Sequence, residues 1–307
     1  MIIMAEPTKQ NKQIKITDLL SADFMARLDS LDILSKRVLR GVLHGERRSK
    51  RRGQSVEFAD HRPYVSGDDL RFVDWNIYGR LDQLFLKLFL EEQDLTVHVL
   101  IDVSASQAFG EPSKEMYMKK LAAALCYISM VNNNRVNLTA FADGIVGQLK
   151  NMRGRGYLRQ MTEFLMTTTC RGASDFDAAA AQLAAGRMGS GIVIVLSDFF
   201  FKEGFELGLK RLATKNYELY AMQVLSPQEI EPDLTGDLKL IDLEDEDTAE
   251  VTISGALMKY YRKNLTAYCN DIKDFCTRRG STYVLANTSS PVERLVLNYL
   301  RRIRLVR

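Results

Sequence analysis

The sequence has few of the residues on which common enzyme sites depend. It contains three histidines, His44, His61 and His98, and none lies near a convincing serine or cysteine nucleophile. A Ser-His-Asp triad is therefore disfavoured. No G-x-x-x-x-G-K-[ST] segment occurs, which argues against a P-loop nucleotide site. We therefore expect that the protein is not an enzyme.

Cysteines and long apolar runs are also scarce. The four cysteines among 307 residues form no C-x-x-C pair, so reduced thiols are expected. No apolar run reaches the roughly 18 residues of a membrane span, and the first residues lack the apolar stretch of a signal peptide. The net charge of +3 favours no class of partner. Together these absences predict a cytoplasmic protein without a membrane span.

The pattern along the chain predicts three parts. Residues 1–15 are expected to form a disordered arm. Residues 16–94 combine apolar residues at helical spacing, continuing as far as Leu39, with a later region of short strands and turns. From residue 95 to 307, strand-like runs alternate with helix-like runs, interrupted by an expected β-hairpin insertion at about 232–254. This alternation predicts an α/β fold with a mostly parallel sheet flanked by helices.

Polar residues follow two of the predicted strands where those strands end. Asp102, Ser104 and Ser106 follow the strand "TVHVLID", and Asp198 follows "GIVIVLS". Open α/β sheets bind ligands at the carboxyl ends of their strands. Two buried carboxylates there would repel each other unless a cation lay between them. Oxygen-only ligands favour a hard cation such as Mg²⁺. The alternative is a turn that caps the next helix.

The D-x-S-x-S motif, the later strand-end acid and the α/β alternation resemble the von Willebrand factor A domain. The resemblance implies a metal-ion-dependent adhesion site made of Asp102, Ser104, Ser106 and Asp198, with a hydroxyl from a separate loop. That loop position holds Ser174, where the family typically has threonine. Thr169 is a weaker alternative for the same position.

A second motif lies upstream. The pattern R-P-Y-x-x-G-D-x-x-R-x-x-D-W, residues 62–75, resembles the bacterial domain-of-unknown-function 58 family. The resemblance implies a partnership with a MoxR-type AAA+ ATPase in the assembly or activation of other proteins. Candidate partner-binding residues are Asp175 and four residues of the motif: Arg62, Asp68, Arg71 and Asp74. The alternative is that the motif's charges form ion pairs that hold an irregular region together, with Trp75 as a packing anchor.

The sequence thus favours a non-enzymatic, metal-dependent protein-interaction module. Mg²⁺, Mn²⁺, Ca²⁺ and the absence of any ion in the resting protein all stay open. A metal-dependent hydrolase or phosphatase that uses Asp102 is one alternative. A nucleic-acid-associated protein that uses the basic run at residues 47–52 is the other. We expect a protein partner with an acidic residue, and no nucleic acid.

Overall fold

The computed structural model of the protein describes residues 16–33, 57–90, 95–186, 191–213, 217–233, 236–241 and 248–307. The chain divides into two compact units. One comprises Ser35–Asp94, and the other combines Met1–Leu34 with Leu95–Arg307. The structure therefore groups the N-terminal helix with the larger unit, although the sequence pattern had grouped it with the region before residue 95.

The larger unit is built on a six-stranded sheet in the order β10-β7-β6-β3-β4-β5. All neighbouring pairs are parallel except β4 and β5, which are antiparallel. Every residue of the central strands β3, β6 and β7 is buried. The strands are β3 (Thr96–Asp102), β4 (Arg135–Phe141), β5 (Ile145–Met152), β6 (Gly191–Ser197), β7 (Tyr217–Leu225) and β10 (Thr282–Asn287).

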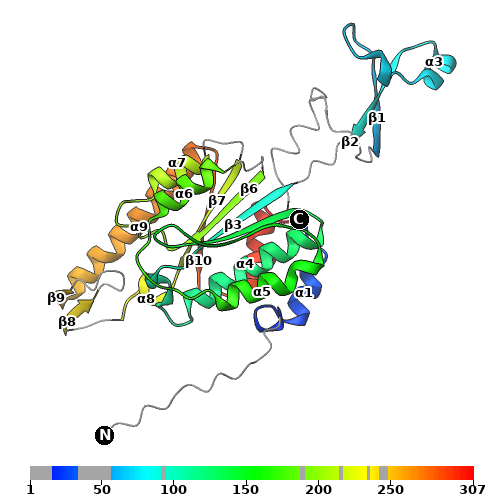
Figure 1. Ribbon diagram of the computed structural model, residues 1–307. Coiled ribbons are helices and arrows are strands. Elements are labelled where there is room, and N and C mark those ends of the chain that lie inside the picture. The colour runs from blue at the N-terminus through cyan, green and yellow to red at the C-terminus, as the bar shows by residue number, and fades with distance from the viewer. Residues whose placement is uncertain are drawn as a thin grey trace. The chain divides into compact units, whose positions relative to one another are not determined.

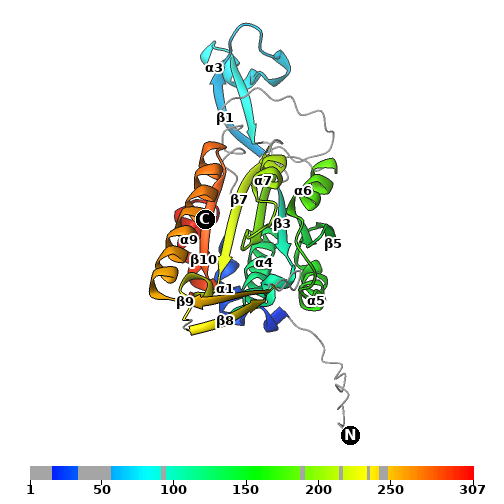
Figure 2. The same cartoon turned by 90° about the vertical axis from the view of Figure 1, so that its left-hand side faces the viewer.

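Helices cover both faces of this sheet (Figures 1 and 2). On one face lie α1 (Ala22–Leu28), α4 (Lys114–Val131) and α5 (Leu158–Thr167). On the other lie α6 (Phe176–Ala185), α7 (Glu206–Ala213) and α9 (Gly255–Arg278). The side chains of each strand alternate between the two faces, so that Leu100, Val193 and Val195 join the core beneath α6, α7 and α9. The predicted fold class, an α/β fold with a mostly parallel sheet flanked by helices, is thereby confirmed.

Smaller elements complete the larger unit. The strands β8 (Gly236–Ile241) and β9 (Thr248–Ile253) pair as an antiparallel hairpin where the insertion was expected. The remaining short helices are η1 (Ile16–Asp18), η3 (Ala105–Ala108), η4 (Arg155–Tyr157), α8 (Pro227–Ile230), α10 (Val292–Arg294) and η5 (Leu295–Leu300). None of the helices in the described ranges is long and apolar enough to cross a bilayer.

The N-terminal helix is shorter than its apolar spacing suggests. Ser21, a residue type that favours this position, caps the helix, since its hydroxyl accepts a hydrogen bond from the backbone N–H of Phe24 at 3.2 Å. The helix ends at Leu28, and Ile33 then pairs antiparallel with Val306 near the C-terminus. Leu31 and Ile33 are therefore buried in the core from a segment that is not helical. The later part of the expected helix lies outside the described residues.

The smaller unit is an antiparallel pair of strands with two short helices between them. These elements are β1 (Glu57–Pro63), η2 (Leu70–Phe72), α3 (Trp75–Leu81) and β2 (Phe85–Leu90). The expectation that Trp75 is a packing anchor is wrong, because the residue is 61% exposed. Its ring lies edge-to-face with that of Tyr78, with the centroids 6.0 Å apart.

Candidate functional site at the carboxyl ends of the strands

Asp102 ends β3 in the middle of the sheet and is 1% exposed. Its Oδ1 accepts hydrogen bonds from the backbone N–H of Ser104 at 3.0 Å and from the Ser104 hydroxyl at 2.8 Å. Its Oδ2 accepts one from Ser197, at the end of the neighbouring strand β6, at 2.7 Å. Parallel pairing of β3 with β6 sets Asp102 beside Ser197. All three of these hydrogen bonds to the Asp102 carboxylate come from neutral donors.

The charge of Asp102 is poorly compensated. Burial, and after it the negative charge of Asp198, raises the pKa of Asp102 to about 7, although the hydrogen bonds from Ser197 and Ser104 act in the opposite direction. An ionised Asp102 is therefore costly in the protein by itself. A cation placed against it would remove that cost, as the sequence pattern had suggested.

The serines of the motif converge beside this carboxylate. The hydroxyl oxygens of Ser104 and Ser106 lie 3.1 Å apart, and the Ser104 hydroxyl is 2.8 Å from Asp102. Neighbouring oxygens around an octahedral Mg²⁺ are separated by about 3 Å, since Mg–O distances are about 2.1 Å. Both distances therefore match the spacing of neighbouring oxygens in a magnesium shell, and all three side chains offer the hard oxygen donors that this ion prefers.

A buried amide adjoins the serines. Gln107 donates from Nε2 to the Ser106 hydroxyl at 3.1 Å. Its Oε1 is buried and has no hydrogen-bond partner within the part of the chain that the structure describes. An unsatisfied buried oxygen is unusual and favours a further ligand at this place. In the same described ranges no cluster of three or more His, Cys, Asp or Glu side chains could hold a metal, so a cation would have to rely on the hydroxyls.

The loop of Ser174 is fastened to the loop of the motif. The backbone N–H of Ala105 donates to the carbonyl of Gly172, and that of Arg171 donates to the carbonyl of Val103, both at 2.9 Å. Ser174 is half-buried on this loop. Asp175, a predicted partner-binding residue, caps α6 by accepting from the backbone N–H of Ala178 at 2.8 Å. The structure thus joins the two predicted loops and gives Asp175 a helix-capping role.

Asp198 follows β6, and both of its carboxylate oxygens accept from protein donors. Oδ1 accepts from the backbone N–H of Phe200 at 3.1 Å, and Oδ2 accepts from the ammonium of Lys114 at 2.8 Å. Phe199 lies between Asp198 and Phe200 in the sequence and has a φ of +61°. This left-handed conformation turns the chain so that the N–H of Phe200 reaches back to Asp198. Gln223 on β7 holds the Asp198 carbonyl from the other side at 2.8 Å.

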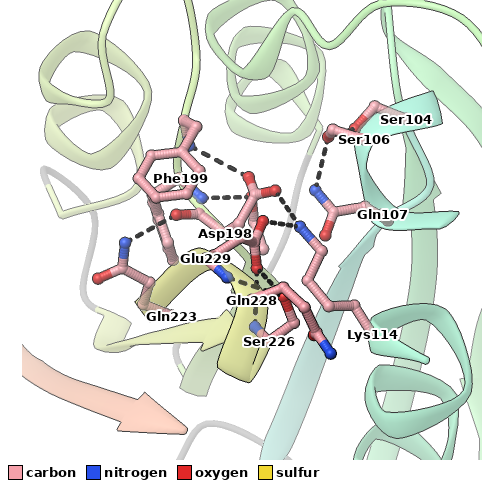
Figure 3. A network of polar contacts seen from close by, with 12 residues as sticks. Ser104, Ser106, Gln107, Lys114, Asp198, Phe199, Gln223, Ser226, Gln228 and Glu229 are labelled. Atoms are coloured by element: carbon pink, nitrogen blue, oxygen red, sulfur yellow. Dashed lines mark hydrogen bonds and ion pairs between the residues drawn. The ribbon is translucent and has the colours of Figure 1, made fainter. Parts of the chain in front are cut away.

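Lys114 is the main residue that sequence reasoning missed. Its side chain is fully buried, and its ammonium also contacts Glu229 Oε1 at 2.5 Å (Figure 3). In Figure 3 the carboxylates of Asp198 and Glu229 lie on one side of this ammonium, with Gln107 and the two serines on the other. Burial alone would lower the pKa of Lys114, but the charges of Asp198 and Glu229 outweigh it and raise the pKa. The ammonium is therefore charged.

A weak signal for Lys114 was present in the sequence. The residue opens α4 directly after the cap Ser113, and a positive charge at a helix N-terminus is opposed by the helix dipole. A lysine there requires acidic partners, yet nothing in the local sequence identifies them. Glu229 lies 115 residues further along the chain, so only the fold brings the pair together.

The remaining predicted partner-binding residues belong to the smaller unit. Arg62 pairs with both carboxylate oxygens of Asp68, at 2.9 and 2.7 Å. Arg71 pairs with Asp69, and Asp74 accepts from His61 at 3.0 Å. These contacts agree with the alternative that the motif's charges hold an irregular region together. The basic run at residues 47–52 lies outside the described residues.

Comparison with known proteins places these features in a family. An uncharacterized protein of Mycobacterium tuberculosis (strain H37Rv) is 26% identical over 252 residues, which are 80% of this chain and 79% of the relative. The crystal structure of the conserved hypothetical protein BatB from Bacteroides thetaiotaomicron covers 68% of this chain and 98% of its own, at 14% identity and a TM-score of 0.43. The SpRpn10 VWA domain covers 67% and 95%, at 12% identity and a TM-score of 0.40. The family model "Protein of unknown function DUF58" matches residues 60–270, and the chain therefore belongs to the DUF58 family.

Proposed function

We propose that the protein is a non-enzymatic interaction module that binds a carboxylate of a partner protein through a metal ion at the strand ends. The observation that carries this proposal is the convergence of Asp102, Ser104 and Ser106, since the Ser104 hydroxyl lies 2.8 Å from Asp102 and 3.1 Å from Ser106, the spacing of neighbouring oxygens in a magnesium shell. Asp102 would supply the charge, and Ser104, Ser106 and Ser174 would supply neutral oxygens. The metal, when bound, supplies a positive centre with positions open to a partner's Asp or Glu.

The chemistry of the site supports binding better than catalysis. A phosphatase with an aspartate nucleophile usually has a second acid two residues later to protonate the leaving group. Here that residue is Ser104, and its hydroxyl already donates to Asp102. The expected partner is a MoxR-type AAA+ ATPase, as the family resemblance implies, and the cytoplasm is the compartment in which the two would meet.

Metal binding to the full chain is the first test. The protein is stripped with EDTA and titrated calorimetrically with Mg²⁺ and Mn²⁺, beside Asp102→Ala and the control Asp177→Ala. Asp177 is an acid on nearby α6 that pairs with Arg211 at 2.6 Å. We expect about one equivalent of metal to bind to the wild type and to the control, and none to bind to Asp102→Ala.

Partner capture is the second test. A MoxR-type ATPase should be retained by the immobilised protein in Mg²⁺ and released by EDTA. Retention that is indifferent to both EDTA and Asp102→Ala would contradict a metal-bridged contact. Hydrolysis of a phosphomonoester that disappears in Asp102→Ala would instead favour the hydrolase hypothesis.

A further inference from the structure

The buried ammonium of Lys114 lies at the end of the sheet where the proposed metal would bind. The candidate donor set contains two carboxylates, and they differ in their partners. Lys114 neutralises Asp198 at 2.8 Å, whereas the hydrogen bonds that Asp102 accepts from Ser104 and Ser197 come from two hydroxyls and a backbone N–H, which are all neutral. Of this pair, Asp102 is therefore the carboxylate that an external cation would still compensate when it is ionised.

Lys114 is held in place by a dedicated set of contacts. The loop before it packs against α8 so closely that a Cβ on Gly110, at φ +103°, would lie 2.6 Å from the Cβ of Ser226. Gln228 accepts from the N–H of Glu111 at 3.2 Å and donates to its carbonyl at 2.8 Å. The capping box of Ser226 and Glu229 fixes the Glu229 carboxylate, which contacts the Lys114 ammonium. The ammonium is therefore a fixed part of the site.

The geometry points to Lys114 as a built-in cation that competes with the metal. By occupying Asp198 and adding a positive charge, it lowers the affinity of the site for a divalent ion and leaves a single carboxylate, Asp102, to bind it. A metal held by one carboxylate and neutral hydroxyls stays strongly electropositive, so the partner's carboxylate becomes the second charged ligand. Metal and partner would then bind together. This inference rests on the proposed metal-dependent function.

The test measures Mn²⁺ affinity in the EDTA-stripped full chain by calorimetry. Lys114→Met removes the charge and keeps an unbranched apolar chain that is one atom shorter than lysine. We expect it to raise the Mn²⁺ affinity at least tenfold, because Asp198 becomes available and a repulsive charge is lost. The control is Lys119→Met. Lys119 is a second buried lysine on α4, but its ammonium contacts Glu115 and the Thr168 carbonyl. We expect the control to stay within twofold of the wild type.

A second variant separates the release of Asp198 from a change in overall charge, and it covers the case in which Lys114→Met does not fold. Lys114→Met combined with Glu229→Gln removes one positive and one negative charge, so the net charge of the cluster is unchanged. Glutamine still completes the capping box. We expect this variant also to bind Mn²⁺ at least tenfold more tightly than the wild type. An affinity equal to the wild type would overturn the inference.

The outcomes distinguish this inference from the proposed function. If the wild type binds Mn²⁺ and both Lys114 variants bind it equally well, the role of Lys114 is refuted while the metal site stands. If neither the wild type nor any variant binds Mn²⁺, the proposed function and the inference fail together. If the metal binds only to the Lys114 variants, the inference holds, and the wild-type site requires a partner's carboxylate for metal binding.

Discussion

Two networks of charged side chains in this protein use similar residues in different surroundings. At the strand ends, Lys114, Asp198 and Glu229 form ion pairs in which the lysine is fully buried. In the smaller unit, Arg62 and Asp68 form an ion pair that is partly exposed to solvent. Water screens the second pair and takes little part in the first. Burial therefore decides which network controls stability and chemistry.

The pKa values express the same difference. In the smaller unit the hydrogen bond from His61, with further donors, lowers the pKa of Asp74 to about 2, so that acid stays ionised at neutral pH. At the strand ends burial raises the pKa of Asp102 to about 7. A buried acid with a strongly perturbed pKa is a common sign of a functional site, whereas an acid paired with a cation is a common sign of a structural one.

The largest expected effect comes from breaking the buried network. Lys114→Met in EDTA leaves Asp198 and Glu229 without their counter-charge, and removal of one partner of a buried ion pair typically costs about 3–5 kcal/mol. Urea unfolding should therefore show a large drop in the free energy of unfolding. A midpoint equal to the wild type would mean that water or relaxation compensates the two carboxylates.

The second prediction concerns His98, a buried ionisable group whose pKa is shifted by burial alone, in contrast to the ion-paired Lys114. His98 on β3 is 2% exposed, and burial lowers its pKa to about 4 from the ordinary 6.5. The native state then binds fewer protons than the unfolded state between these values, so stability is present above pH 6.5 and is lost as pH falls toward 4. The free energy of unfolding should fall by about 3 kcal/mol from this group once the pH is below both pKa values.

Substitution of His98 isolates this contribution. In His98→Gln, the decrease in the free energy of unfolding that the imidazole causes at low pH should vanish. The decrease that the carboxylates cause should remain. Urea midpoints measured from pH 7 to pH 4 for both proteins supply the comparison. Parallel curves for wild type and variant would show that His98 is solvated or protonated in the native state.

The smallest expected effect is in the exposed network. Arg62→Met removes the partner of Asp68, but the carboxylate stays in contact with water and with the backbone N–H of Val65 at 2.9 Å. We expect a shift in the urea midpoint well below that of Lys114→Met, and smaller still in 1 M salt, which screens exposed pairs. A shift of equal size would mean that the smaller unit's motif is as critical to folding as the buried lysine.

Much of the fold and part of the site follow from sequence pattern. Alternating strand-like and helix-like runs predict the sheet and its covering helices because each element must bury an apolar face. D-x-S-x-S after an apolar strand predicts that Asp102, Ser104 and Ser106 meet, because they are neighbours at a strand end. The apolar spacing did not predict that the N-terminal helix ends at Leu28, since Leu31 and Ile33 meet the core from a segment that is not helical.

The sequence by itself determined the local parts of this protein: which strands are buried, where Ser21 caps a helix, and which three oxygens follow β3. Only the tertiary structure decided which charges meet. Lys114, Asp198 and Glu229 come from α4, the end of β6 and α8, and no local rule links residues 84 and 115 positions apart. The physical reason is that ion pairing acts through space and desolvation depends on burial, and both are properties of the assembled fold.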